Sequence, residues 1–268
     1  MEGRAGIVES LQGRQALAEP GMRIVIVADI HSNLEAFEAV LEHAAASGPI
    51  DRVWCLGDVV GYAADPTACI ALLRRYPCTA VAGNHDLAAV GELGTDEFNV
   101  AAARAAAWTS EQLSAEDHEY LSSLPFLAVE GDFTLVHGSL RAPEWEYLLS
   151  TAAAAEHLQL QETPYGLVGH SHVPFVAFER EAGVGGPPAI TPLGDGDVVK
   201  LGDVRLVANP GGVGQPRDGD PRASCAVYDS EAHTITLHRV QYDVEKAQRK
   251  ILEAGLPSYL AERLSYGR

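Results

Sequence analysis

The sequence predicts an α/β fold in which helices cover a largely parallel sheet. From Met22 to about residue 90, buried-strand runs alternate with amphipathic helical runs, a pattern typical of parallel sheets. Farther along, short strand-like runs are separated by turns, which predicts a second, more antiparallel sheet. Apolar residues make up 47% of the chain and charged residues 21%, as in ordinary globular proteins.

The domain is expected to begin at Met22, where the strand-like run MRIVIVADIHSN starts. Residues 1–21 show no strong pattern and are predicted to be an N-terminal extension. No internal repeat or linker divides the remainder, so residues 22–268 are predicted to be a single domain.

Two strand–loop–helix units and a third strand open this domain. The first helix, SNLEAFEAVLEHAAASGP, has Leu34, Phe37 and Leu41 at helical spacing. DRVWCLGD is predicted to be the second strand, and DPTACIALLRRYP a helix with Asp65 as N-cap and Pro66 at its first position. CTAVAGNHD is the third strand. Loops at the carboxyl ends of such strands are available for chemistry.

The remainder adds helices and short strands. Residues 95–124, approximately, are alanine-rich and predict a helical insertion beside the site, with a second helix start at Ser114 followed by Asp117. Strands are predicted at FTLVHGS, YGLVGHSH, VPFVAFER, VRLVANPG, SCAVYDS and HTITLHRV. The Gly/Pro-rich residues 182–197 predict an exposed hairpin or loop. A C-terminal helical tail, interrupted at residues 255–257, completes the domain.

Composition excludes several classes of function. The formal net charge of −18 argues against long nucleic acid as a partner, because nucleic-acid binding normally uses a basic face. No apolar run approaches the roughly 18 residues that span a bilayer, and no signal-peptide pattern is present, so the expected location is cytoplasmic. The four cysteines form no CxxC pair, which predicts reduced, mostly buried thiols.

Polar side chains gather where the predicted strands end. Residues two apart on an extended chain project to one side, so Asp29 can face the same pocket as His31, and His170 the same pocket as His172. The strand-end set contains seven potential metal ligands: Asp29, His31, Asp58, Asn84, His137, His170 and His172. Five histidines outside this pattern are expected to be solvated: His43, His118, His157, His233 and His238.

These residue types suit a centre of two metal ions. Asp58 has two carboxylate oxygens and can bridge two cations, whereas an imidazole or an amide oxygen binds one. Mixed nitrogen and oxygen ligands without thiolate favour divalent Mn, Fe, Zn or Ni. Two such ions, two carboxylates and one hydroxide leave a charge of about +1, which favours an anionic substrate. Paired cations also support in-line displacement at phosphorus, so the sequence predicts a hydrolytic phosphoester site.

Five short motifs in a fixed order carry a family resemblance. DxH, GD, GNHD, a lone His after an apolar strand, and GHSH resemble the signature blocks of the calcineurin-like metallophosphoesterase superfamily. GDVVGYAADP and NPGGVGQPRDGDPRASCAVYD resemble its branch of small bacterial and archaeal phosphodiesterase-like proteins. The resemblance runs from about Met22 to about Tyr242. It implies a four-layer α-β-β-α sandwich with two central mixed sheets flanked by helices.

The resemblance also implies roles for individual residues. One metal would be held by Asp29, His31, Asp58 and His172, and the other by Asp58, Asn84, His137 and His170. His85 would donate a proton to the leaving oxygen or stabilise charge there. Asp86 would orient the ring of His85 or, alternatively, cap a helix. Arg217 and Arg222 are candidates for binding the anionic substrate, although arginines in such loops often pair with surface carboxylates.

The leading functional expectation is metal-dependent hydrolysis of a small phosphodiester, with a metal-bridging hydroxide as nucleophile. A phosphomonoesterase acting on proteins or small molecules shares the same motifs and is the alternative enzyme. A non-catalytic metal-binding scaffold is the alternative from another class, but loss of catalysis predicts missing ligands, and none is missing. The expected partner is a small phosphoester, without membrane or long nucleic acid, and the sequence does not indicate an oligomeric state.

Overall fold

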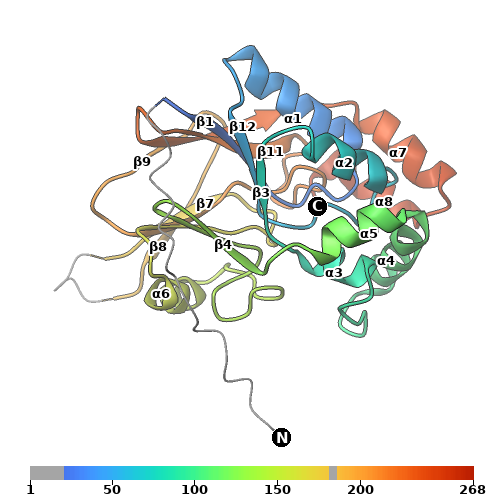
Figure 1. The fold of residues 1–268 in the computed structure, drawn as a ribbon, viewed down its shortest axis with the longest axis horizontal. Helices are drawn as coiled ribbons and strands as arrows, with labels where there is room; N and C mark the ends of the chain where they lie inside the picture. Colours follow the sequence, from blue (N-terminus) through green and yellow to red (C-terminus); the bar gives the residue numbers. More distant parts are fainter. Residues whose placement is uncertain (1–20, 181–185) are drawn as a thin grey trace, which may run out of the picture.

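The computed structural model describes residues 21–180 and 186–268, which form two six-stranded mixed sheets packed face to face (Figure 1). The N-terminal extension predicted for residues 1–21 lies almost wholly outside the described residues. In the order in which the strands pair, the first sheet contains β3 (Cys78–Ala80), β2 (Arg52–Cys55), β1 (Arg23–Val27), β11 (Ala223–Asp229), β12 (Thr234–Val240) and β9 (Val198–Lys200). The second contains β4 (Leu127–Glu130), β5 (Phe133–Val136), β6 (Tyr165–Leu167), β10 (Leu206–Asn209), β7 (Phe175–Phe178) and β8 (Ala189–Pro192).

The sheets are not divided between the two halves of the chain. Strand β11 pairs antiparallel with β1, where Ile24 lies opposite Tyr228, and it carries β12 and β9 into the first sheet. The parallel pairs are β1–β2 and β2–β3 in the first sheet and β5–β6 and β6–β10 in the second. The expectation of a second sheet built from late strands is confirmed for β4, β5, β6, β7, β8 and β10, but β9, β11 and β12 join the first sheet. Local pattern does not encode such pairing between distant strands.

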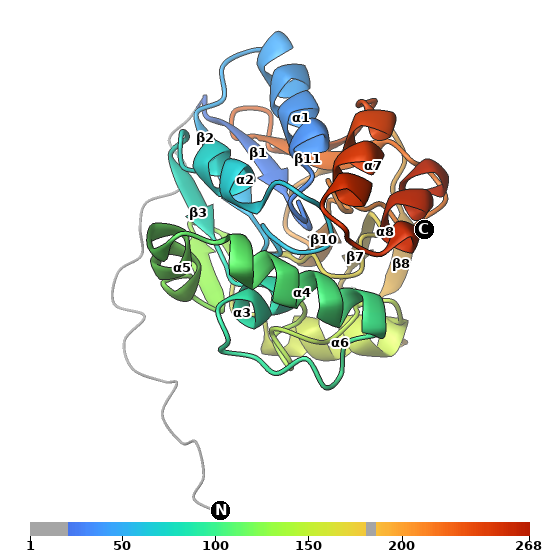
Figure 2. The ribbon, with the colours of Figure 1, turned by 90° about the vertical axis from the view of Figure 1, so that its right-hand side faces the viewer.

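Helices complete four layers. The outer face of the first sheet packs against α1 (Leu34–Ala46) and α2 (Pro66–Leu73), whereas α6 (Thr151–Leu160) covers the outer face of the second (Figures 1 and 2). Side chains alternate along β1, so that Val25 and Val27 meet the helices while Ile24 and Ile26 face the other sheet. This four-layer α/β sandwich is the architecture that the resemblance implied.

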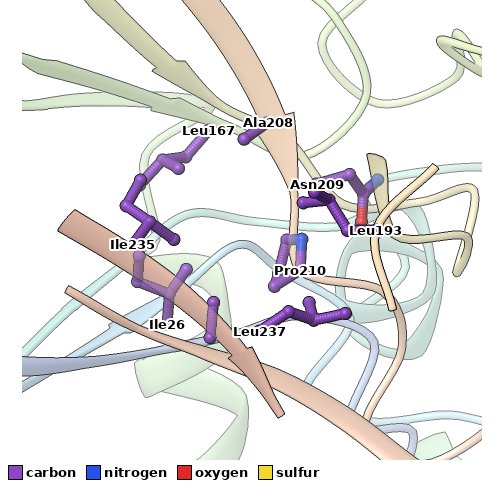
Figure 3. Close-up of a pocket in the computed structure, with 9 residues that line it drawn as sticks. Ile26, Leu167, Leu193, Ala208, Asn209, Pro210, Ile235 and Leu237 are labelled. Atoms are coloured by element: carbon purple, nitrogen blue, oxygen red, sulfur yellow. The ribbon is translucent and has the colours of Figure 1, made fainter. Parts of the chain in front are cut away.

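The central layer is a dry contact between the sheets. Ile26 of β1 and Leu237 of β12 face Leu167 of β6 and Ala208 of β10 across a narrow apolar space (Figure 3). Full burial of one such aliphatic side chain contributes about 1.5 to 3 kcal/mol to folding. This packing fixes the two sheets relative to each other, and with them the loops at their carboxyl ends.

The remaining helices lie beside these loops. They are α3 (Asn84–Ala89), α4 (Val100–Gln112), α5 (Ala115–Ser122), α7 (Val244–Glu253), α8 (Ser258–Glu262) and the 3₁₀ helix η1 (Arg263–Tyr266). The insertion predicted for residues 95–124 corresponds to α4 and α5, and Ser114 and Asp117 form the expected capping box. The tail is α7, α8 and η1, which pack against α4 in one apolar cluster. No helix in the described ranges is long and apolar enough to cross a bilayer.

Several local expectations need correction. Part of the predicted loop at residues 182–197 forms β8, while residues 181–185 lie outside the described residues. Asp65 precedes α2 as expected, but its carboxylate binds the Lys250 ammonium at 2.8 Å instead of capping the helix. His157 is buried, not solvated, because α6 places it against the second sheet. Strand β4 and helix α6 were not predicted.

Candidate metal centre

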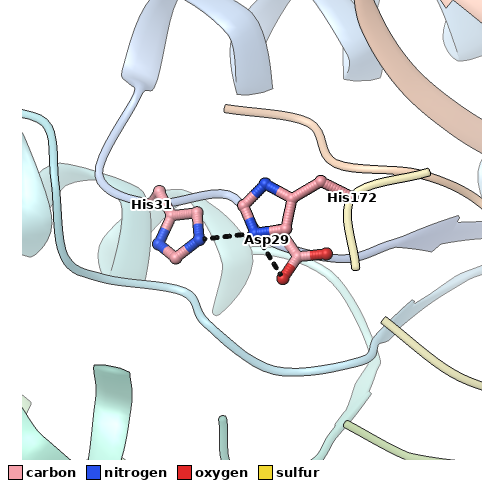
Figure 4. Close-up of side chains that lie close together, drawn as sticks. All are labelled: Asp29, His31 and His172. Carbon is pink, nitrogen blue, oxygen red and sulfur yellow. Dashed lines mark hydrogen bonds and ion pairs between the residues drawn. The ribbon is translucent and has the colours of Figure 1, made fainter. Parts of the chain in front are cut away.

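The seven predicted ligands meet at one edge of the sandwich, in loops that follow five strands. They follow β1 (Asp29, His31), β2 (Asp58), β3 (Asn84), β5 (His137) and β6 (His170, His172). Every one of these side chains is buried, and none belongs to a residue more than 4% exposed. Figure 4 shows the part built by Asp29, His31 and His172, where residues about 140 positions apart in sequence converge.

The backbones of these loops are tied to one another. The amide of Asp29 donates to the carbonyl of Gly57 at 3.0 Å, and the amide of His31 donates to the carbonyl of Asp58 at 2.9 Å. Five of the predicted ligands adopt positive φ, a conformation that costs non-glycine residues on the order of 1 kcal/mol or more: Asp29, His31, Asp58, His170 and His172. The hydrogen bonds between loops hold this strained arrangement in place.

The glycine of the GNHD motif is required by close approach to Asp58. A Cβ atom at Gly83 would lie 2.1 Å from Oδ1 of Asp58, well inside contact distance. The same oxygen accepts a hydrogen bond of 2.8 Å from the amide of His85. The chain after β3 can therefore cradle the Asp58 carboxylate only without a side chain at position 83.

Each of four histidines is held by a backbone carbonyl at its outer ring nitrogen. The donor–acceptor pairs are His31 Nδ1 to Val60 (3.1 Å), His137 Nδ1 to Leu56 (2.7 Å), His172 Nδ1 to Gln215 (2.5 Å) and His170 Nε2 to Trp145 (3.1 Å). A carbonyl can only accept, so the proton of each neutral ring lies on that outer nitrogen. The inner nitrogen of each ring consequently carries a lone pair.

These lone pairs face each other in two pairs. His31 Nε2 lies 3.2 Å from His172 Nε2, and His137 Nε2 lies 3.1 Å from His170 Nδ1. Two lone pairs cannot form a hydrogen bond, so each pair needs a proton or a cation between its nitrogens. The donor sets fit divalent metal ions, which bind neutral imidazole nitrogen.

Asp58 lies between the two imidazole pairs. Its Oδ2 atom is 3.6 Å from His31 Nε2 and 3.3 Å from His137 Nε2. The Asn84 amide oxygen lies 3.3 Å from His137 Nε2, and Asp29 Oδ1 lies 3.3 Å from His172 Nε2. Asp29 Oδ2 is buried without a hydrogen-bond partner among the described residues. All seven predicted ligands are thus brought together, with the carboxylate of Asp58 in the middle.

Burial and mutual charge set the protonation of this cluster. Burial lowers the pKa of His170 to about 3, holds those of His31 and His172 well below their usual range, and raises that of Asp29 to about 7. Burial also opposes charge on Asp58 and His137, but their attraction prevails. It keeps the pKa of Asp58 well below its usual range and raises that of His137 to about 9. A proton on His137 therefore substitutes for part of the positive charge that a metal ion would supply.

His85 lies beside the seven predicted ligands, and one of its ring nitrogens is within 4.8 Å of ligand atoms of His31 and Asp58. Its ring is flanked by Tyr62 at 4.3 Å and Phe98 at 4.7 Å between centroids, and its Nδ1 is buried without a partner among the described residues. Burial lowers the pKa of His85 to about 4. Asp86 does not orient this ring, because its two oxygens accept from the amides of Val60 and Gly83. The capping alternative is the one that the geometry supports.

The two candidate arginines occupy different surroundings. Arg217 lines the pocket over the cluster, with its guanidinium 5.8 Å from the Tyr62 ring centre and its Nε buried without a partner in the described ranges. Arg222 instead pairs with Asp220 and Asp195 and does not line this pocket. Position thus favours Arg217 and not Arg222 as a substrate ligand.

Sequence reasoning missed the aromatic walls of this pocket. Tyr62, Phe98, Trp145 and Tyr147 line it beside Asn84, His85 and His170. Trp145 and Tyr147 belong to the loop between β5 and α6, whose Leu140 amide donates to Nδ1 of the buried His157. The only available signal was the run PEWEY after the lone His, which has no periodicity to indicate a pocket.

Comparison with known proteins identifies the family. Residues 22–233 match the model of the calcineurin-like phosphoesterase superfamily domain. A metallophosphoesterase from Sphaerobacter thermophilus has a similar crystal structure, with a TM-score of 0.83 and 44% identity over 92% of this chain and 100% of that chain. An uncharacterized protein of Methanocaldococcus jannaschii is 38% identical over 91% of this chain and 98% of its own length.

A more distant relative carries a named activity. The symmetrical bis(5'-nucleosyl)-tetraphosphatase of Glaesserella parasuis is 29% identical, over 50% of this chain and 51% of its own length. The motifs, the fold and these matches lead to one conclusion. The chain belongs to the calcineurin-like phosphoesterase superfamily and is a metal-dependent phosphoester hydrolase.

Proposed function

We propose that the protein hydrolyses small phosphodiesters at a centre of two divalent transition-metal ions. One observation carries the proposal. In each of two imidazole pairs the nitrogens that carry lone pairs face each other, 3.2 Å apart in one pair and 3.1 Å in the other, and one carboxylate oxygen of Asp58 lies between the two pairs. Divalent ions in such a centre acidify a water molecule and neutralise phosphate charge. The expected ions are Mn, Fe, Zn or Ni, since the ligands are nitrogen and oxygen without thiolate.

The residues divide the work. Asp58 would be shared by both ions, Asp29, His31 and His172 would complete one metal-binding half, and Asn84, His137 and His170 would complete the other. The carbonyls that hold the outer ring nitrogens fix the tautomers before any ion binds, which limits reorganisation during the reaction.

His85 acts at the leaving oxygen. It lines the pocket next to the proposed ligand Asn84. Because burial lowers its pKa to about 4, the free protein holds a neutral ring at pH 7. A neutral ring donates a hydrogen bond, and an anionic substrate favours full protonation. His85 therefore stabilises charge on the leaving group and transfers a proton where that group is strongly basic.

Substrate charge favours a diester. A residual charge of about +1 at the metal ions matches the single charge of a phosphodiester. The tetraphosphatase name of the distant relative supports hydrolysis at phosphorus in a small molecule. The net charge of −18 disfavours long duplex DNA, and the cytoplasmic location expected from the sequence stays a prediction.

A matched pair of chromogenic esters tests the proposal. With Mn²⁺ supplied, kcat/KM should be higher for bis-p-nitrophenyl phosphate than for p-nitrophenyl phosphate at neutral pH. Cleavage of long duplex DNA should be weak. Absence of hydrolysis of both esters by protein with bound metal would refute the catalytic proposal and favour the scaffold alternative.

Arg217 supports the second candidate, a phosphomonoesterase. A monoester dianion gains more than a diester from a nearby guanidinium, and Arg217 has an unpartnered Nε in the described part of the pocket. Arg217→Ala should therefore reduce activity on the monoester more than on the diester. A clear preference of the unmodified protein for the monoester would make this candidate the leading one.

A further inference from the structure

Two aromatic walls border the open side of the pocket. Phe98, just before α4, meets Trp145 of the loop between β5 and α6 edge to face, with ring centres 5.5 Å apart. Tyr147 lies on the His170 ring in a parallel stack at 4.1 Å and 12°. The pocket is open to solvent. Tyr147 is 47% exposed although it stands in this pocket, so aromatic surface is available to a ligand.

The walls directly adjoin the residues assigned to chemistry. The Phe98 ring is 4.7 Å from that of His85, and the Tyr147 ring covers His170. A planar group bound between these walls would therefore lie near the metal centre, close enough to be covalently linked to a phosphate bound there. Aromatic walls favour a planar ring, because stacking on Trp, Tyr or Phe contributes about 1 to 3 kcal/mol per base.

One carboxylate in the pocket favours binding of a nucleobase over binding of an aromatic ring that has no N–H group. Apart from Asp58, Glu97 is the only acidic residue among the described residues that line the pocket. Its exposed side chain makes no hydrogen bond or ion pair with the described residues. A carboxylate repels phosphate but accepts hydrogen bonds from N–H groups. Every nucleobase carries an N–H donor on its edge, whereas a phenyl ring carries none.

We propose that Phe98, Trp145 and Tyr147 form a nucleobase subsite, with Glu97 at the base edge, so that the substrate is a phosphoester or phosphoanhydride of a nucleoside. This inference rests on the proposed hydrolysis at the metal centre. It adds the chemical class of one substituent on phosphorus. Arg217, which lines the same pocket, is assigned to the phosphate in this proposal.

Two esters with the same leaving group separate the subsite from the chemistry. Both the p-nitrophenyl ester of thymidine monophosphate and methyl p-nitrophenyl phosphate release p-nitrophenolate, and only the first carries a base. The protein should have a kcat/KM at least about 10-fold higher for the nucleoside ester, mostly through KM. Trp145→Ala should lower kcat/KM for the nucleoside ester at least about 10-fold more than kcat/KM for the methyl ester, whereas Trp145→Phe should retain most of the preference.

Controls keep the two proposals distinguishable. Phe126→Ala removes an aromatic ring that is 49% exposed outside the pocket and should leave the preference intact. A nucleoside monophosphate should inhibit hydrolysis of the methyl ester at least about 10-fold more strongly than ribose phosphate, and Trp145→Ala should remove this difference. Equal kcat/KM for the two esters, or equal losses in Trp145→Ala, would overturn the subsite and leave the hydrolase proposal standing. Failure to hydrolyse either ester would refute the hydrolase proposal, while equal binding of nucleoside monophosphate and ribose phosphate would refute the subsite independently.

Discussion

The two halves of the proposed metal centre differ in what surrounds them. The inner half, Asp29, His31 and His172, is held by carbonyls of Val60 and Gln215 in buried loop backbone. The outer half, Asn84, His137 and His170, depends in part on the carbonyl of Trp145, a partly exposed residue of the β5–α6 loop. Asn84 and His170 both line the pocket, but only His172 of the inner half does. Buried loop backbone therefore supports the inner half, whereas the β5–α6 loop, which lines the pocket, completes the outer half.

The largest effect is expected at the residue shared by both halves. Asp58→Ala should reduce bound metal from two ions per chain to less than one and lower kcat/KM by more than about 10³-fold, because both ions lose a ligand. Elemental analysis and diester kinetics measure this. Asp65→Ala, which removes a carboxylate that pairs with Lys250 outside the centre, should retain both ions. Full metal content in Asp58→Ala would exclude a bridging role.

Substitution of His85 tests the chemical step without affecting metal binding in either half. His85→Ala should keep both ions yet lower kcat by roughly 10² to 10⁴-fold, since a group acting at the leaving oxygen is lost. The loss should be smaller for p-nitrophenyl esters than for alkyl esters, because p-nitrophenolate requires little protonation. Equal losses for both ester types would instead assign His85 to phosphate positioning.

Chelation tests the difference between the halves directly. Under excess chelator, one ion should leave at least about 10-fold faster than the other, because two ligands of the outer half line the pocket and only one of the inner half does. His170→Ala should remove the fast phase, whereas His31→Ala should remove the slow one, as measured by release into a metal indicator. A single release phase in the unmodified protein would contradict the distinction.

The smallest expected effect is the pH dependence of the loop that completes the outer half. Burial lowers the pKa of His157 to about 4, against about 6.5 in an unfolded chain. The unfolded state therefore binds more protons between these values, so stability is full above about pH 6.5 and falls as the pH drops towards 4. His157 should account for about 2 kcal/mol lost between pH 7 and pH 5.

Denaturant unfolding of His157→Gln at both pH values measures this contribution. The variant should lose less stability on acidification than the unmodified protein, whatever its stability at pH 7. His118→Gln, at an exposed position of α5, serves as the matched control and should show the unmodified pH dependence. Identical pH profiles for the His157 and His118 variants would show that burial does not lower the pKa of His157.

Local features of the fold were predictable where they depend on neighbours in sequence. The apolar spacing of Leu34, Phe37 and Leu41 predicted α1, and the pair Ser114 and Asp117 predicted the start of α5. The pairing of β11 with β1 was not predictable, because strands about 200 residues apart are matched by tertiary packing rather than by local propensity. The short β4 was also missed, because its sequence LAVE does not alternate apolar and polar residues although its burial alternates.

The candidate site followed the same rule. Residues at strand ends, such as Asp29 and His170, were predicted because the strands before them were recognisable in the sequence and because few residue types bind metal ions. Trp145 and Phe98 were not found, since they lie in irregular segments whose position depends on distant packing. Arg217 and Arg222 looked equivalent in sequence, and only the carboxylates near Arg222 separate them.

The positive φ angles of five proposed ligands affect how mutation and selection act at these positions. Glycine adopts such a backbone without steric cost, so a glycine at Asp29 or His172 would relieve strain in the metal-free chain. Mutational drift under selection for stability alone would therefore favour loss of the ligands. Retention of all seven is the outcome expected under selection for metal-dependent activity, in opposition to the stability of the backbone.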